Sequence, residues 1–150
     1  MFPKFFRMPL MALLLLSLTG CDKDEETPQP MATTFDKQIT FHIFTEADYR
    51  DSRWNNSNMR LHLQLRRLAQ NPHKETVVLD TTISWAAFRD MPSKAASLQF
   101  ARRLPQVNRL DEQVTVSISK VVSIDGYQTT FAHQQTLQPE AETEVVEVKL

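Results

Sequence analysis

The chain has 150 residues, a net charge of −1, one cysteine and two glycines. A single cysteine excludes a disulfide within the chain, and so little glycine excludes the glycine-rich phosphate loops of nucleotide-binding sites. The length suits one small domain with a sizeable core.

Residues 1–20 have the pattern of a secretory signal. Lys4 and Arg7 precede an apolar run from Leu10 to Leu18. Because this run is far shorter than the ~20 apolar residues that span a bilayer, we expect a cleaved signal peptide and no permanent transmembrane helix.

The stretch Leu18-Thr19-Gly20-Cys21 follows the apolar run directly. It resembles the lipobox of bacterial lipoproteins. The resemblance implies cleavage before Cys21, a diacylglyceryl thioether on its sulfur and an acylated amine. The lipid bilayer would then be a partner through Cys21, since each buried CH₂ contributes ~0.8 kcal/mol to membrane binding.

The next residues, Asp22 to Glu26, are a charge run. Lys23, Asp24 and Glu25 resemble the surface-export signal of Bacteroidota-type lipoproteins, which implies an outer-membrane, surface-exposed protein. Two alternatives stay open. The run is a solvated part of a tether, with the protein facing the periplasm, or Asp22 causes inner-membrane retention, as in the enteric-type sorting rule. Residues 27–34 hold two prolines and no apolar periodicity, so 21–34 is interpreted as an extended tether.

Residues 35–150 are interpreted as a single domain whose dominant period is two. Apolar residues alternate with polar ones over 39–43 and, with great regularity, over 59–66. This alternation predicts half-buried β-strands. A β-branched run at 76–82 predicts a third strand after a turn at Asn71-Pro72.

The middle of the domain is ambiguous. Residues 83–88 continue a strand or form a turn around Trp85. Residues 93–104 are interpreted as a strand because Pro92 and Pro105 bracket them. A helix is the alternative for this segment.

Residues 114–137 predict a β-hairpin. Asp125-Gly126 lies between two strand patterns and favours a two-residue type I′ turn. That turn would pair Ile124 with Tyr127, Lys120 with Phe131, Ile118 with His133 and Val114 with Leu137. Val114, Val116, Ile118, Tyr127, Phe131 and Leu137 would then share one face. A bulge is expected near Lys120-Val121, where the alternation slips. Residues 146–150 predict a last strand.

Six or seven short antiparallel strands in one domain indicate an all-β fold. The pattern resembles an immunoglobulin-like or transthyretin-like Greek-key β-sandwich of about seven strands. The resemblance is architectural only, and such folds host many functions.

Charge is unevenly distributed along the chain. Residues 49–110 hold 11 basic and 4 acidic residues, a net charge of +7, whereas residues 21–48 and 111–150 each carry −5. One interpretation is an arginine-rich face for an anionic glycan or acidic partner. The other is cross-pairing between the basic middle strands and the acidic outer ones. The lipid anchor and the net negative charge argue against nucleic acid.

The candidate binding loop lies at 49–58, with Arg50, Arg53, Trp54 and Asn55 as its contact residues. Trp, Arg and Asn are frequent in binding loops; capping of the sandwich edge by Trp54 is the alternative. His42 and His62 could meet only on neighbouring strands, and without a third ligand no metal site is predicted. His133 is expected to be half-buried. No catalytic motif and no cofactor motif is present in the sequence.

These features predict a non-enzymatic, lipid-anchored accessory or binding module that engages an outer-membrane protein partner or a glycan. One alternative is a structural subunit of a fimbrial or surface assembly, with the strand that ends at Leu150 adding to a neighbour's sheet edge. The other alternative is a small hydrolase or an enzyme inhibitor.

Overall fold

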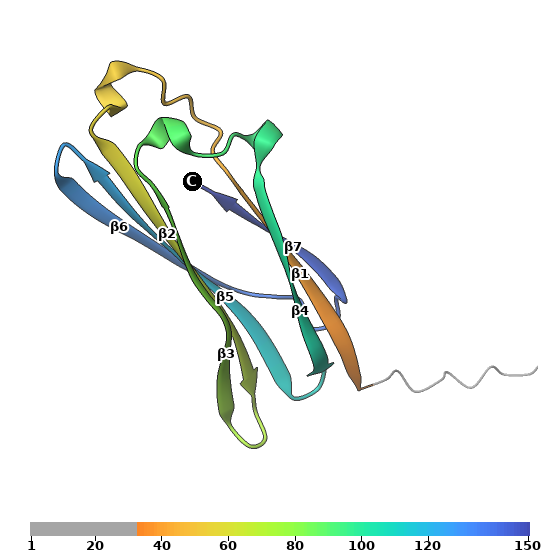
Figure 1. Cartoon of the computed structure of the whole chain (residues 1–150). Helices are drawn as coiled ribbons and strands as arrows, with labels where there is room; N and C mark the ends of the chain where they lie inside the picture. The colour runs from red at the N-terminus through yellow and green to blue at the C-terminus, as the bar shows by residue number, and fades with distance from the viewer. Residues whose placement is uncertain (1–32) are drawn as a thin grey trace, which may run out of the picture. The chain divides into compact units, whose positions relative to one another are not determined.

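The computed structural model describes residues 33–150. They form seven β-strands in two packed sheets (Figure 1), so the all-β sandwich expected from the sequence is confirmed. The strands are β1 (Thr34–Phe44), β2 (Ser57–Ala69), β3 (Lys74–Trp85), β4 (Leu98–Asn108), β5 (Glu112–Ile124), β6 (Tyr127–Thr136) and β7 (Thr143–Lys149).

The two sheets have different numbers of strands. One has the order β4-β1-β7 and the other the order β3-β2-β5-β6. Neighbouring strands are antiparallel except β1 and β7, which are parallel. In the constant-type immunoglobulin order the first strand pairs with the second. Here β1 lies between β4 and β7 instead, so the immunoglobulin order is not the one adopted.

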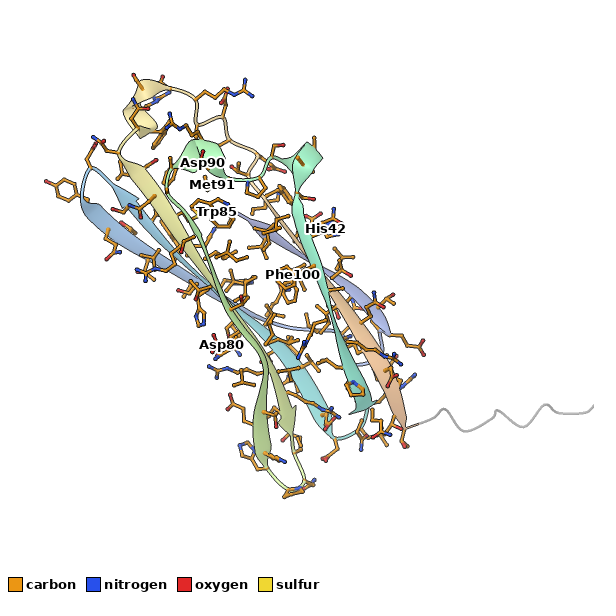
Figure 2. All side chains as sticks on the ribbon, viewed as in Figure 1. His42, Asp80, Trp85, Asp90, Met91 and Phe100 are labelled. Carbon is orange, nitrogen blue, oxygen red and sulfur yellow. The ribbon has the colours of Figure 1, made fainter. Side chains whose placement is uncertain are left out.

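The core lies between the sheets, where the alternating residues of the strands meet. Leu61, Leu63 and Leu65 of β2 are fully buried and face Ile39, Phe41 and other apolar residues of the facing sheet. Burying such a side chain contributes about 1.5–3 kcal/mol. Phe41 also stacks on Phe100 of β4, with 5.0 Å between ring centroids. Figure 2 shows Phe100 and Trp85 between the two sheets.

The hairpin of β5 and β6 has the predicted register. Ile124 pairs with Tyr127, and Ile118 pairs with His133. Asp125 and Gly126 have φ values of 49° and 85°, as a type I′ turn requires at both central positions. The expected bulge near Lys120-Val121 is wrong, because pairing continues through both residues without a shift. The register shifts occur instead in the pairing of β1 with β4 and in that of β2 with β3, where the extra residue lies on β4 and on β3.

The predicted strand over 93–104 is correct from Leu98 onward. Its first residues instead form a short 3₁₀ turn, Lys94–Ala96, whose N-terminus is capped by the Ser93 hydroxyl accepting from the Ala96 amide. Pro105 does not end β4, which continues to Asn108. Pro is tolerated there because β4 is an edge strand of its sheet.

β6 behaves differently from the prediction. Phe131 and Tyr127 lie in phase with the core positions of β5, yet their side chains are 53% and 83% exposed. His133, expected to be half-buried, is exposed as well. The reason is tertiary: β6 is the edge of the larger sheet, and no strand among residues 33–150 lies opposite it.

A buried lysine ties β1 to the connection between β6 and β7. Lys37 is only 1% exposed. Its Nζ donates to the carbonyl oxygens of Gln138 and Ala141 at 2.8 and 2.6 Å, and pairs with the Glu144 carboxylate at 2.9 Å. All three ammonium protons therefore have acceptors, which removes most of the cost of burying the charge.

Candidate functional site

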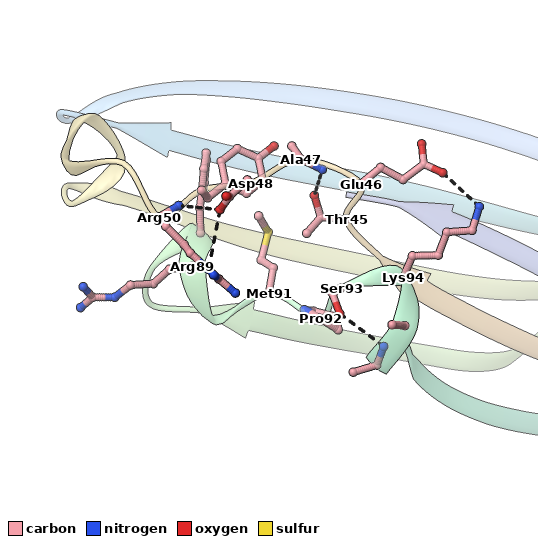
Figure 3. Close-up of a pocket in the computed structure, with 14 residues that line it drawn as sticks. Thr45, Glu46, Ala47, Asp48, Arg50, Arg89, Met91, Pro92, Ser93 and Lys94 are labelled. Atoms are coloured by element: carbon pink, nitrogen blue, oxygen red, sulfur yellow. Dashed lines mark hydrogen bonds and ion pairs between the residues drawn. The ribbon is translucent and has the colours of Figure 1, made fainter.

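A groove lies at the end of the domain where β1 finishes. It has a volume of about 790 Å³ and is lined by two segments, 45–50 and 88–96 (Figure 3). The chain enters the domain at the other end of β1, at Thr34. An 11-residue strand rises about 35 Å, so the groove faces away from the entry point of the chain (Figure 1).

Short-range hydrogen bonds fix the walls of this groove. The Thr45 amide donates to the Pro92 carbonyl at 2.7 Å, which joins the two lining segments. The Thr45 hydroxyl accepts from the Ala47 amide at 3.1 Å. Ser93 caps the 3₁₀ turn that follows. Each segment is therefore held by its own polar side chains and by a main-chain bond to the other.

An aromatic cluster supports the groove from beneath. The Tyr49 ring meets the Phe88 ring at 4.9 Å and the Trp54 ring at 5.3 Å between centroids, both edge-on. Phe88 is 3% exposed. Ser57 links the cluster to β2, since its hydroxyl donates to the Trp54 carbonyl at 2.5 Å and accepts from the Phe88 amide at 3.3 Å. Pairs of this kind contribute about 0.5–1.5 kcal/mol beyond the area they bury.

The rim of the groove carries charges of both signs. The Glu46 carboxylate pairs with the ammonium groups of Lys94 and Lys149, each at 3.3 Å. The hydrogen bond from Lys94, followed by that from Lys149, lowers the pKa of Glu46. Arg50 is 91% exposed and lies 3.8 Å from Asp48. Arg89 is exposed and has no ion pair among residues 33–150.

The predicted loop residues divide into two groups. Arg50 lines the groove. Arg53, Trp54 and Asn55 lie in and just after the 3₁₀ turn Ser52–Trp54, outside the groove lining. The Arg53 guanidinium pairs with Asp51 at 3.5 Å and lies 5.5 Å from the Trp54 ring. The contacts of Trp54 are those of the capping alternative, because its half-buried ring packs on Tyr49 and Phe88.

Sequence reasoning missed the second wall of the groove. Arg89, Met91 and Lys94 come from the connection between β3 and β4, about 40 positions from Arg50. No short-range pattern links the two segments. The other candidates, Cys21, Lys23, Asp24 and Glu25, lie outside the described residues.

The two histidines considered for a metal site do not meet. His42 is on β1 and His62 is on β2, which belong to different sheets. Both side chains face outward, so the sandwich separates them; Figure 2 shows His42 and Asp80 on opposite sides. His62 bonds to Asp80 at 2.7 Å, and that bond is the main cause of the lowered pKa of Asp80. Within residues 33–150, no group of three or more potential ligands is gathered for a metal ion.

Several basic residues of the middle of the chain pair with carboxylates of the acidic outer segments. Five ion pairs cross between these parts: Arg67–Glu112 at 2.6 Å, Lys94–Glu46 at 3.3 Å, Arg109–Glu142 at 3.6 Å, Arg50–Asp48 at 3.8 Å and Arg103–Asp36. Arg53 and Arg66 pair instead with carboxylates of the middle itself. The cross-pairing interpretation therefore applies to five of the eleven basic residues of the middle segment.

Comparisons with known proteins give no relative for this chain: no family model, no curated protein and no solved structure matches it. Within residues 33–150, no helix has the length and apolar character needed to cross a bilayer.

Proposed function

We propose that this protein is a non-enzymatic, lipid-anchored module of the outer membrane, exposed at the cell surface, that binds a partner protein through the groove at the end of β1. The observation that carries the proposal is the position of the groove. It lies at the end of the sandwich opposite the point where the chain enters the domain. A domain tethered through Cys21 would have that end free to meet a partner.

The chemistry of the groove suits a protein surface. Its rim holds Arg50 and Arg89 with Glu46, Asp48 and Lys94, so both signs of charge are available for complementary pairing. Arginine is the charged residue most enriched where binding energy concentrates, and here both arginines are exposed. A glycan is the second candidate because Tyr49 lines the groove and an aromatic ring can stack on a sugar.

The test is crosslinking on intact cells, followed by recovery of the lipoprotein and mass spectrometry of what accompanies it. We expect one dominant surface protein. The double charge reversal Arg50→Glu with Arg89→Glu should abolish its recovery, because two rim cations become anions. Arg60→Glu is the matched control, since Arg60 is an exposed arginine on β2 outside the groove.

Two outcomes would contradict the proposal. Equal recovery of the partner with the double variant would exclude the groove as the contact. Recovery of the lipoprotein alone, with binding of the purified protein on a glycan array, would favour the glycan.

Protease added to intact cells tests the location, because protection of the domain until the envelope is opened would exclude surface display.

A further inference from the structure

The free edge of β7 is the second feature of this domain that suggests binding, and it is independent of the loop-end groove. β7 pairs with β1 on one side, and no strand among residues 33–150 pairs with its other side. The facing sheet has one strand more, so β6 extends past β7 without a strand opposite it. The sandwich therefore has an unfilled strand position.

The inner face of β6 supplies an apolar floor for that position. Phe131 and Tyr127 lie in phase with Ile118 on the face that points to the other sheet, but they remain 53% and 83% exposed. A single large apolar side chain that is exposed to solvent is common on protein surfaces. Here two of them lie on one strand, on a face that elsewhere in the sheet forms the core.

A groove lies between this floor and β7. Its volume is about 240 Å³, and Phe131, Ile118 and Val148 line it together with charged residues of β5 and β7. The main chain of β7 forms one edge of this groove, on the side where no strand among residues 33–150 pairs with it. A strand that entered here would thus meet apolar side chains on one face and unpaired peptide groups along one edge.

The hydrogen bonds of β7 show which peptide groups are available. The Gln38 amide donates to the Glu142 carbonyl at 2.7 Å, and the Leu150 amide donates to the Phe44 carbonyl at 2.8 Å. Peptide groups alternate in direction along a strand, so those of Val145, Glu147 and Lys149 point to the free edge. The Lys149 carbonyl confirms this direction, because it accepts from the Lys120 ammonium at 2.9 Å.

We propose that this position accepts an extended segment of a partner protein as an eighth strand, with apolar residues at alternate positions and polar residues between them. The apolar side chains would cover Phe131 and Tyr127. The polar residues between them would point to the outer face of the smaller sheet, because successive side chains of a strand point to opposite faces. Main-chain pairing would supply the affinity and the floor would supply the specificity, as in other cases of strand addition.

A second copy of the domain does not fit the same edge. If the β7 strands of two copies paired directly, β7 of the second copy would lie opposite β6 of the first. The projecting β6 of the second copy would then overlap the larger sheet of the first copy. The position has room for one strand and not for a strand with a sheet facing it. This steric argument favours an isolated extended segment.

The experiment uses the full-length lipoprotein in detergent and fluorescein-labelled eight-residue peptides, with fluorescence anisotropy as the readout. The probe alternates Val with Glu. The control peptide has the same composition in two blocks. We expect saturable binding of the Val-Glu peptide and at least tenfold weaker binding of the block peptide. Equal binding of the block peptide would overturn the proposal, because it would show that the protein does not recognise the alternation of apolar and polar residues.

Two variants locate the site. Val145→Pro removes an amide that points to the free edge and leaves the bonds to β1 intact, and Phe131→Ser removes the apolar floor. Each should weaken binding at least tenfold. Thr130→Pro is the matched control, because alternation from the paired positions of β6 directs its amide to that strand's own free edge. Binding lost with Thr130→Pro and kept with Val145→Pro would overturn the proposal.

Hydrogen exchange keeps the test decisive if a variant does not fold. In the unmodified protein, the amides of Val145, Glu147 and Lys149 should exchange rapidly and become protected when the Val-Glu peptide is added. Unchanged exchange at these amides with bound peptide would place the peptide elsewhere. Protection that depends on protein concentration without peptide would identify a second copy as the occupant and contradict the steric argument.

Discussion

At the residue scale, the least expected feature is the buried Lys37. Its position in the chain, two residues before the first predicted strand, gives no sign of burial. The structure places it in phase with Ile39 and Phe41 on the inner face of β1. Its three oxygen acceptors fix the connection from β6 to β7, which in turn fixes the start of β7 beside β1.

We therefore predict that Lys37→Met destabilises the domain by about 3–5 kcal/mol, because it leaves the half-buried Glu144 carboxylate and two carbonyls without their donor. The measurement is urea unfolding followed by tryptophan fluorescence. The double variant Lys37→Met with Glu144→Leu should regain part of the loss, since it removes the unpaired charge as well. A single variant as stable as the original protein would show that the ion pair contributes nothing net.

Glu112 gives a prediction for pH. Burial raises its pKa, but the hydrogen bonds from Arg67 and from the Asn108 amide outweigh burial, so the pKa lies below its ordinary value of 4.5. A carboxyl whose pKa is lower in the folded state stabilises the fold above its unfolded pKa. That stability is lost as pH falls through the folded pKa.

Accordingly, the free energy of unfolding should fall as the pH drops below about 4.5. Glu112→Gln should lower stability at pH 7 and flatten this dependence, because the variant has no carboxyl to protonate there. Urea unfolding of both proteins at pH 7, 5 and 3.5 measures the effect. Parallel curves for the two proteins would mean that Glu112 does not contribute to the acid sensitivity.

At the element scale, the hairpin of β5 and β6 is the element that local sequence specifies best. Its two-residue turn places Gly126 at a φ of 85°, where a side chain is strained. The space around Gly126 is open, since an added Cβ would have no neighbour within 4 Å. The free-energy cost of a substitution at Gly126 therefore comes from the strained backbone conformation alone.

Gly126→Ala should therefore destabilise the domain by about 1–2 kcal/mol. Gly126→Asn should cost much less, because Asn tolerates the left-handed conformation. Thermal unfolding of the three proteins, monitored by circular dichroism, measures the difference. If the two variants were equally destabilised, the backbone conformation would not be the cause.

The contrast between β2 and β6 gives a second prediction at this scale. Leu63→Ala should cost about 2–5 kcal/mol, because Leu63 is fully buried at the centre of the core. Phe131→Ala removes a larger side chain and should cost less than about 1 kcal/mol, because its face is uncovered. Urea unfolding compares the two. A cost for Phe131→Ala near that of Leu63→Ala would mean that β6 is covered in solution.

At the scale of the whole molecule, folding brings together opposite charges that are separated along the chain. The segments 49–110 and 111–150 carry opposite net charges in the sequence. In the sandwich, strands from these segments are neighbours: β2 lies beside β5, and Arg67 meets Glu112 there. Opposite charges that are distant along the chain become adjacent in space.

We therefore expect the protein to bind polyanions weakly, in spite of its arginine content. On a heparin column at neutral pH it should elute below about 150 mM salt, where exposed charges are screened within about 8 Å. Glu112→Lys is the informative variant, because it removes the carboxylate that pairs with Arg67 and should raise the salt needed for elution. Strong retention of the unmodified protein would favour the hypothesis of an arginine-rich face instead.

Local patterns in the sequence determined much of this protein. Alternation predicted the strands at 39–43 and 59–66, and a β-branched run predicted the strand at 76–82. Asp125-Gly126 predicted the hairpin with its register. All three signals act between residues close along the chain. The groove could be predicted only in part. Arg50 was found because it lies in an unusual polar loop, whereas Arg89 and Lys94 carry no local sign of their role.

Only the tertiary structure decided the rest. Alternation shows which residues share a face of a strand, but it does not show whether another sheet covers that face. Ile118 and Phe131 belong to the same face of one hairpin, yet Ile118 is 7% exposed and Phe131 is 53% exposed. The difference arises because β7 is the last strand of its sheet. Burial depends on what lies opposite, and strand order, which the sequence pattern does not contain, decides that.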